Sequence, residues 1–214
     1  MSPKVTLVDY GIGNLLSVRR GFEYWGFDVL TTDNPQTVIE SDRVVLPGVG
    51  SFGLGMKELI NRGLDVAIRS VALSGTPLLA ICLGMQLLFE EGEEYGFTAG
   101  LGIIKGKVSL ISNTSDQRKK VKVPHIGWNA IQKPIDANQW SNSVLRETQV
   151  DEEFYFNHSF SAEPSNSTDV LATCQYGGNE ITAVVNHGST TGCQFHPEKS
   201  GEMGLRILKN FVEQ

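Results

Sequence analysis

The chain has 214 residues, of which 40% are hydrophobic and 20% are charged, a balance typical of a globular protein with a substantial core. Its 18 basic and 24 acidic side chains give a formal net charge of −6, which argues against binding to nucleic acid or to an anionic membrane surface. The first residues lead into a strand pattern without a cleavable apolar segment, and the longest apolar run, residues 78–89, is too short to span a bilayer. Three scattered cysteines form no disulfide framework, so we expect a cytoplasmic protein.

Strand-like and helix-like segments alternate in the first half of the chain. The predicted strands cover residues 4–10, 27–31, 43–48 and 77–82. The predicted helices cover roughly 15–25, a segment that opens at Asn34-Pro35, and a stretch that ends near residue 74. The strand at 77–82 is apolar throughout, which indicates burial on both faces in a parallel sheet. Strands joined through helices predict a doubly wound α/β sheet.

The second half contains short segments rich in β-branched and aromatic residues, separated by Gly and Asn turns. These segments cover residues 106–111, 153–160, 170–176, 181–187 and 191–196. They are predicted to be antiparallel strands added to the parallel core. The chain ends in a helix with Ser200 as its N-cap, and we expect residues 1–214 to form a single α/β domain.

Cys82 lies where the buried strand ends and an amphipathic segment begins. A helix that starts here directs its partial positive charge and free N–H groups at the thiol, which favours a reactive thiolate. The position resembles a nucleophile elbow, in which the next residue donates its N–H to an oxyanion, and Gly84 would allow the sharp turn. Because free cysteine is also a common core residue, position alone leaves both interpretations open.

A thiolate nucleophile requires a base, and His196 in the sequence QFHPE is the best candidate among four histidines. Pro197 favours an extended conformation at His196, and Glu198 is close enough to orient the imidazole. Together with Cys82 these residues supply a nucleophile, a base and an orienting carboxylate. Gly48 and Gly50 in the loop after a parallel strand could direct N–H groups at developing negative charge, although such loops are often only tight turns.

The motifs ICLGMQLL and QFHPEKS resemble those of the class I, triad-type glutamine amidotransferases, which have a flavodoxin-like architecture. PGVGSFG and HIGWN are similar to motifs of one member family, the glutaminase subunit of imidazole glycerol phosphate synthase. YGIGN, EEGEE and FYFNHSF agree with the same family. The resemblance runs from residue 4 to the final helix.

This resemblance implies a glutaminase that needs neither cofactor nor metal. Cys82 would form a glutamyl thioester, His196 would protonate ammonia and activate water, and Glu198 would hold the imidazole. The oxyanion hole would come from the N–H of Leu83 and from the Val49–Gly50 peptide after a flip. The residues implied to contact L-glutamine are Gly48, Gln86, Glu94, Ser159 and Phe160. Phe160 replaces a tyrosine that is frequent in the family, but its expected contact is through the backbone.

The resemblance also implies a heterodimer with a (β/α)8-barrel cyclase subunit, which would use the ammonia to make imidazole glycerol phosphate and aminoimidazole carboxamide ribotide in histidine biosynthesis. The implied interface residues are Asn14, Arg20, Trp128, Tyr155 and Lys199.

Four alternatives stay open at this point. A paralogous glutaminase that supplies ammonia to a sugar amidotransferase would carry the same catalytic residues. A noncatalytic regulatory subunit predicts a lost nucleophile, base or oxyanion loop, and all three are present. A Cys-dependent peptidase would not need the PGVG and HIGWN segments together. A metal site is the weakest alternative because Cys174, Cys193 and His187 lack ligand spacing.

Overall fold

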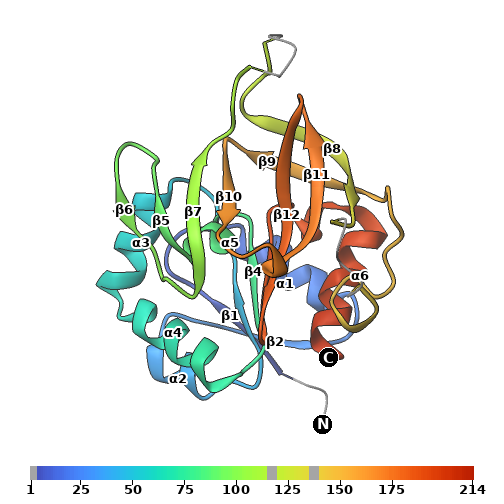
Figure 1. Cartoon of the computed structure of the whole chain (residues 1–214). Coiled ribbons are helices and arrows are strands. Elements are labelled where there is room, and N and C mark those ends of the chain that lie inside the picture. Colours follow the sequence, from blue (N-terminus) through green and yellow to red (C-terminus); the bar gives the residue numbers. More distant parts are fainter. Residues whose placement is uncertain (1–3, 115–119, 135–139) are drawn as a thin grey trace.

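The computed structural model describes residues 4–114, 120–134 and 140–214 (Figure 1). Its centre is a run of five parallel strands in the spatial order β2-β1-β3-β4-β13. These strands are β1 (Lys4–Val8), β2 (Asp28–Thr32), β3 (Val44–Leu46), β4 (Leu78–Ile81) and β13 (Thr190–Cys193). This is the flavodoxin-like order, with β13 as the fifth strand, so the predicted fold class is confirmed.

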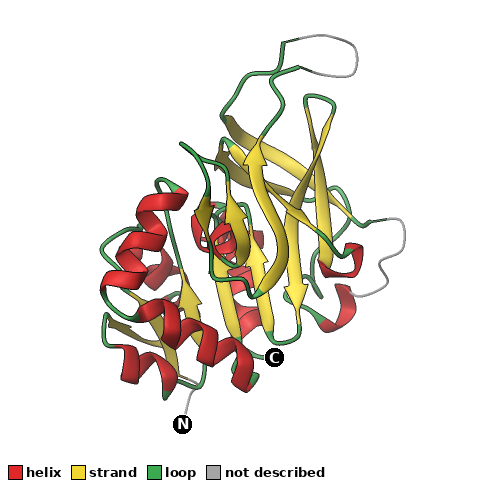
Figure 2. Cartoon of the chain, turned by 60° about the vertical axis from the view of Figure 1, so that its left-hand side comes forward, coloured by secondary structure: helices red, strands yellow, loops and turns green. Residues whose placement is uncertain are grey.

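Helices flank both faces of the parallel sheet (Figure 2). They are α1 (Leu15–Glu23), α2 (Pro35–Ile39), α3 (Phe52–Asn61), α4 (Leu64–Ser74) and α6 (Gly201–Val212). Side chains of β4 alternate between two cores, because Leu79 and Ile81 join the core under α1 and α6, whereas Leu78 and Ala80 join the core under α2, α3 and α4. Burial on both faces explains the unbroken apolar sequence of β4.

Beyond β13 the large sheet continues with antiparallel strands in the order β13-β12-β11-β8-β9. They are β12 (Asn179–His187), β11 (Val170–Tyr176), β8 (His125–Gln132) and β9 (Glu153–His158). The prediction that residues 191–196 form an added antiparallel strand is wrong in one respect, since β13 is antiparallel to β12 but parallel to β4. All four residues of β13 are buried, as expected of a strand in the middle of a sheet.

The remaining strands form a separate sheet of four, in the order β10-β7-β5-β6. They are β10 (Phe160–Pro164), β7 (Ile104–Leu110), β5 (Phe89–Gly92) and β6 (Thr98–Ala99). The expectation that every late strand extends the parallel core is therefore wrong, and the predicted segment 153–160 divides between the sheets at Ser159. A β-branched and aromatic pattern predicts a strand, but it does not specify the neighbour with which that strand pairs.

The helix after Cys82, α5 (Leu83–Leu87), is only five residues long and buried throughout. The expectation of an amphipathic segment is wrong here, because α3, β4, β5 and β13 surround α5. The polar side chain of Gln86 therefore points into the protein rather than toward solvent, with 6% of the residue exposed.

Two predicted helix caps have different outcomes. Asn34 caps α2 as expected, because its side chain accepts hydrogen bonds from the N–H groups of Gln36 and Thr37. Ser200 precedes α6 as predicted, but its hydroxyl does not cap the helix. The short 3-10 helices are η1 (Trp140–Asn142), η2 (Ser167–Asp169) and η3 (Pro197–Lys199), and η3 directly precedes Ser200.

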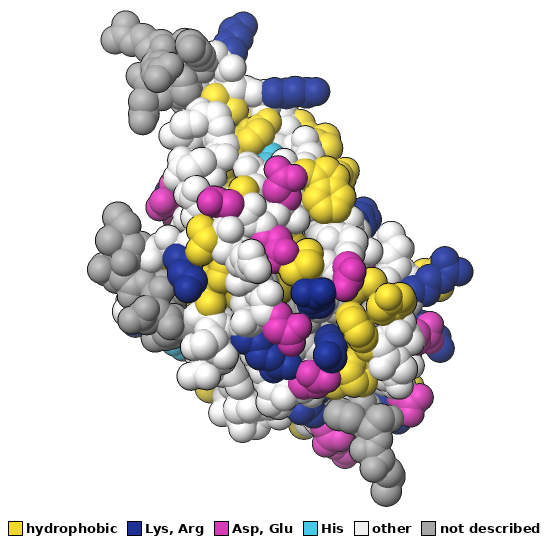
Figure 3. Space-filling model, turned by 90° about the vertical axis from the view of Figure 1, so that its right-hand side faces the viewer, with side chains coloured by type: hydrophobic (Ala, Val, Ile, Leu, Met, Phe, Trp, Pro, Cys, Tyr) yellow, Lys and Arg dark blue, Asp and Glu magenta, His cyan; other side chains and the backbone are white. Residues whose placement is uncertain are grey.

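The surface carries charges of both signs. On the face that Figure 3 shows, hydrophobic side chains lie among acidic and basic ones. Within the described ranges, no helix has the length and apolar character needed to cross a membrane.

Candidate active site

Cys82 occupies a strained turn between β4 and α5. Its φ of 53° and ψ of −110° lie outside the regions that residues with a side chain favour. The backbone N–H of Cys82 donates to the carbonyl of Cys193 on β13 over 2.7 Å. The residue is 6% exposed and lies at the carboxyl end of β4, the edge at which open α/β sheets bind ligands.

Close backbone packing holds this turn in place. A Cβ on Gly84 would overlap the carbonyl oxygen of Leu46 at the end of β3, and a Cβ on Gly48 would overlap the hydroxyl of Tyr10 and crowd Leu83. As expected, Gly84 lacks a side chain where the chain turns sharply, but the residue with positive φ is Cys82 itself. Gly84 instead lets the first turn of α5 lie directly against β3.

His196 is brought to Cys82 by the pairing of β13 with β4, in which Cys193 lies opposite Ile81. Its Nδ1 donates to Glu198 Oε1 over 2.8 Å, and the two side chains are only 3% and 2% exposed. Burial lowers the pKa of His196, but hydrogen bonds and negative charge from Cys82 and Glu198 raise it to about 10. The arrangement therefore favours a protonated His196 imidazole beside the Cys82 sulfur.

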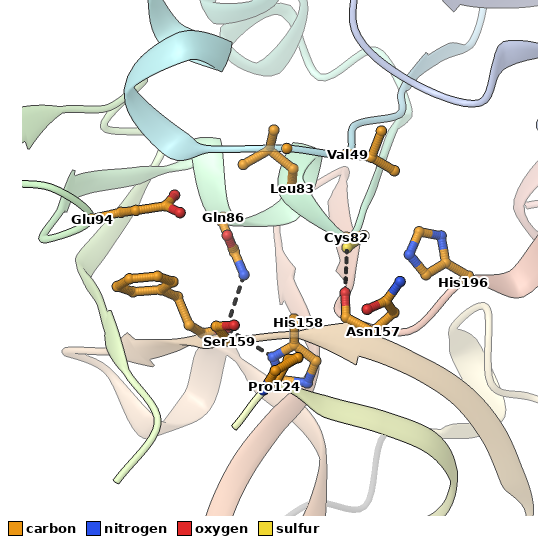
Figure 4. Close-up of a pocket in the computed structure, with 12 residues that line it drawn as sticks. Val49, Cys82, Leu83, Gln86, Glu94, Pro124, Asn157, His158, Ser159 and His196 are labelled. Atoms are coloured by element: carbon orange, nitrogen blue, oxygen red, sulfur yellow. Dashed lines mark hydrogen bonds between the residues drawn. The ribbon is translucent and has the colours of Figure 1, made fainter. Parts of the chain in front are cut away.

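A cavity of about 250 Å³ lies beside the Cys82 thiol (Figure 4). Nine of its lining residues are predicted site residues: Val49, Gly50, Cys82, Leu83, Gln86, Glu94, Ser159, Phe160 and His196. The sequence analysis missed Pro124, Asn157 and His158, which also line it. Gly48 does not line the cavity; it lies beneath Leu83 and Gly84.

Polar side chains lie at the end of the cavity away from His196 (Figure 4). Gln86 Nε2 donates to the carbonyl of Phe160 over 2.9 Å and to Gln194 Oε1 over 3.0 Å. Glu94 Oε2 accepts from the N–H of Phe52, the first residue of α3, over 2.7 Å. Because both donors of Gln86 are used, its carbonyl oxygen is the polar atom left for a ligand.

Val49 and Gly50 form the exposed part of the loop between β3 and α3. At the base of this loop the hydroxyl of Tyr10 donates to the carbonyl of Pro47 over 2.8 Å. Burial raises the pKa of Tyr10 far above its usual value, so the phenol stays a neutral donor. Gly50 has a φ of 108°, which a residue with a Cβ rarely adopts, and among the described residues only Ile12 lies within 4 Å of its missing side chain.

Two buried histidines are joined by a hydrogen bond that the sequence analysis did not predict; His158 lines the cavity and His125 lies next to His158. His158 Nδ1 lies 2.8 Å from the carbonyl of Phe160, so this nitrogen carries the hydrogen and His158 Nε2 is an acceptor. His125 Nδ1, 3.1 Å away, is then the donor to His158 Nε2. Burial lowers the pKa of His125 to about 4 and that of His158 to about 3, so both rings are neutral near pH 7.

The five expected interface residues lie on neighbouring elements. Trp128 on β8 and Tyr155 on β9 are paired across the strands, and their rings meet edge to face at 6.1 Å. Lys199 is exposed on η3, which contacts both β9 and α1. Asn14 caps α1 by accepting from the N–H of Ser17, and Arg20 is exposed on the same helix. Trp128 is 54% exposed, which is high for so large an aromatic residue.

Comparison with known proteins agrees with this fold and site. Residues 6–214 match the family described as Glutamine amidotransferase class-I. The chain superimposes on a structure of PurLQS from Thermotoga maritima with a TM-score of 0.74 and 19% identity, covering 100% of this chain and 99% of that one. At this identity the likeness concerns the fold alone. The fold and the site together define a class I glutamine amidotransferase.

Two curated relatives narrow the assignment. Imidazole glycerol phosphate synthase subunit HisH 1 from Legionella pneumophila (strain Lens) is 42% identical, with 98% of each chain covered. Subunit HisH from Syntrophotalea carbinolica is 43% identical, with 97% of this chain and 98% of that protein covered. The chain belongs to the HisH family of imidazole glycerol phosphate synthase subunits.

Proposed function

We propose that the chain, as a single domain, hydrolyses L-glutamine to L-glutamate and ammonia and passes the ammonia to a cyclase subunit. The observation that carries this proposal is the Cys82 thiol, held on a strained backbone turn beside the buried His196–Glu198 pair, at the wall of a cavity of about 250 Å³. A thiol, an imidazole and an orienting carboxylate in this order are the parts required for acyl transfer through a covalent intermediate.

The chemistry follows from the charge state of the pair. The Cys82 thiolate attacks the side-chain amide carbon of glutamine, and the carbonyl oxygen becomes an oxyanion. When the carbon–nitrogen bond breaks, His196 gives its proton to the departing nitrogen and ammonia leaves. Neutral His196 then takes a proton from water as that water attacks the glutamyl thioester. Glutamate is released, and the thiolate and imidazolium are restored. Glu198 stabilises the charged imidazole through Nδ1.

The oxyanion requires N–H donors. The N–H of Leu83, at the start of α5, is one proposed donor, since Leu83 follows the nucleophile and lines the cavity. The second proposed donor is the Val49–Gly50 peptide, presented after a flip. The φ of 108° at Gly50 and the open space around it support a peptide that can rotate. Gly48 does not line the cavity; it packs closely against Leu83 and Gly84 at the base of the loop.

The amino-acid end of glutamine fits the polar end of the cavity. The free carbonyl oxygen of Gln86 can accept from the substrate ammonium group, and Glu94 adds negative charge nearby. The carbonyl of Phe160 already accepts from both Gln86 and His158, which leaves its N–H as the remaining backbone group for the substrate. Replacement of the usual tyrosine by Phe160 does not affect a backbone contact. Ser159, where the chain passes between the sheets, lines the same end.

The proposed partner is a (β/α)8-barrel cyclase subunit that makes imidazole glycerol phosphate and aminoimidazole carboxamide ribotide in histidine biosynthesis. The names of the relatives support this pathway over ammonia supply for surface polysaccharides. Asn14, Arg20, Trp128, Tyr155 and Lys199 are the proposed interface. The three buried free thiols support a reducing, cytoplasmic setting.

Purification with the cyclase subunit tests the proposal. Glutamate formation should be detected in the complex, should rise when the cyclase acceptor is added, and should fall to background in Cys82→Ala. Ammonia-dependent turnover by the cyclase should survive this substitution. Cys174→Ala is the matched control, because Cys174 is buried in β11 and does not line the cavity. Full glutaminase activity in Cys82→Ala would refute the assignment of Cys82 as the nucleophile.

A further inference from the structure

Gln194 is a buried polar residue that neither the triad nor the substrate contacts account for. It follows β13 between Cys193 and Phe195 and is completely buried. Its backbone N–H donates to the carbonyl of Ala183 over 2.9 Å, so the main chain is fixed. Its side chain extends toward the catalytic cysteine, and Gln194 Nε2 lies 3.8 Å from Cys82 Sγ.

The carbonyl of Phe160 determines the direction of the hydrogen bonds around Gln194, because it fixes the orientation of the Gln86 amide between them. The carbonyl of Phe160 can only accept, so the group that Gln86 presents to it must be its NH2. The same NH2 also faces Gln194, which must therefore present its carbonyl oxygen to Gln86. Its NH2 is then left to face the Cys82 sulfur. Rotating the Gln86 amide by half a turn would place its oxygen against the Phe160 carbonyl oxygen, and rotating the Gln194 amide would place two NH2 donors against each other.

We propose that Gln194 is a positioning residue for the nucleophile, donating a side-chain N–H to the Cys82 sulfur and linking that sulfur to Gln86. The inference rests on the proposed function, in which Cys82 attacks glutamine and Gln86 binds its amino-acid end. The donated N–H stabilises the thiolate form of Cys82 more than the thiol form, because a hydrogen bond to an ionised group is stronger than one to a neutral group. It also holds the sulfur at a fixed distance from the substrate-binding amide.

The proposed bond changes strength during the reaction. When the sulfur becomes part of a neutral thioester, it loses its charge and the N–H bond weakens. When water releases glutamate and the thiolate returns, the bond forms again. Gln194 therefore favours the states in which the sulfur carries negative charge, and its loss should affect kcat more than KM.

Alkylation of Cys82 by iodoacetamide measures thiolate availability without requiring glutaminase activity. Cys174 and Cys193 should not compete, because both are fully buried and burial raises the pKa of each thiol well above its usual value. Gln194→Met removes both hydrogen-bonding atoms at similar side-chain length. Gln194→Glu keeps an acceptor for Gln86 but loses the NH2. The matched control is Asn210→Leu, which removes another completely buried amide, on α6 and outside the cavity.

For Gln194→Met we expect alkylation at neutral pH to slow about tenfold, roughly 1.4 kcal/mol, and to recover at higher pH. Gln194→Glu should slow it at least as much, and in the complex with the cyclase both variants should lose kcat while KM changes little. Asn210→Leu should lower the melting temperature but keep the alkylation profile of the wild type.

A wild-type alkylation profile and kcat in folded Gln194→Met would overturn the inference. If that variant does not fold, the same result in Gln194→Glu would do so. Failure of the proposed function gives a different result, since wild-type protein in the complex would then form no glutamate whatever its alkylation rate.

Discussion

The backbone carbonyl of Tyr155 accepts a hydrogen bond from the backbone N–H of His196 over 2.9 Å. Ser200 strengthens this connection, because its hydroxyl accepts from the N–H of Tyr155 over 2.9 Å and donates to the carbonyl of His196 over 2.7 Å. The strand that carries the proposed interface is thus joined directly to the segment that carries the proposed base. This explains why the Ser200 hydroxyl does not cap α6.

Ser200→Ala should weaken the response of the glutaminase to its partner. The substitution leaves the N–H of Tyr155 without its acceptor, so we expect a loss of about 1–3 kcal/mol in the free energy of unfolding. We also expect a lower stimulated glutaminase rate with nearly unchanged partner affinity. Ser143→Ala is the control, because Ser143 is a buried serine whose hydroxyl also both donates and accepts, away from the cavity. Equal stimulated rates in the two variants would contradict the coupling.

Gly50→Val should lower stimulated glutamine hydrolysis by about 10²–10³-fold, the usual cost of losing one oxyanion donor. Valine is β-branched and resists the positive φ found at Gly50, so the substitution should strain the loop and remove the freedom of the Val49–Gly50 peptide to take either orientation. Glutaminase rate against acceptor concentration, measured alongside partner affinity, checks this. Gly188→Val, in an exposed turn with a φ of 58°, controls for backbone strain alone. A lone wild-type chain as active as the stimulated complex would show that the oxyanion hole is permanently formed.

The free energy of unfolding should fall with acid through His125 and His158. Their pKa values of about 4 and about 3 lie below the unfolded value of about 6.5, so the unfolded chain binds protons first. The contribution of the two neutral histidines to the free energy of unfolding is fully present above about pH 6.5. It declines toward pH 4 by about 1.4 kcal/mol per pH unit for each histidine. Urea unfolding across this range checks the slope. His158→Gln should flatten it, because the substitution removes one of the two groups that bind protons on unfolding.

Gly84→Ala should destabilise the fold by at least about 1–3 kcal/mol and displace the elbow, because the new Cβ meets the backbone of Leu46. Gly53→Ala provides the comparison. Gly53 lies in α3, where an added Cβ would have only Thr98 Oγ1 at 3.4 Å, and alanine there should be neutral or stabilising by about 0.5–1 kcal/mol. Denaturant midpoints and glutaminase rates measure both effects. A neutral Gly84→Ala would show that β3 and α5 can separate without cost.

Local patterns in the sequence were sufficient to predict the parallel core and two residues of the cavity, Cys82 and His196. The predictions for Gln86, Glu94, Ser159 and Phe160 came from the family resemblance alone. An unbroken apolar run followed by Cys82 identifies a buried strand and its exit, and the constrained HPE segment selects His196. The sequence could not predict that β13 pairs with β4, since alternation of residue types does not record the direction of a neighbouring strand.

The contacts of Gln194 and His158 were equally beyond prediction. Each depends on residues more than 30 positions away or on another strand, such as Cys82 and His125. One local signal was available, because Gln194 is a polar residue between the apolar Cys193 and Phe195 in a segment expected to be buried. A buried polar residue needs partners, and its nearness to His196 indicates where those partners lie.

Because the chain passes from one sheet to the other at Ser159, the reacting residues and the residues at the polar end of the cavity belong to different sheets. Cys82 and His196 follow adjacent strands of the large sheet, so their spacing is fixed within one rigid unit. Glu94 and Phe160 belong to the small sheet and its connections, on the opposite side of the cavity. The large sheet therefore fixes the spacing of the reacting pair, and the small sheet shapes the opposite wall of the cavity. Substitutions in the small sheet should alter glutamine binding while Cys82 and His196 keep their spacing.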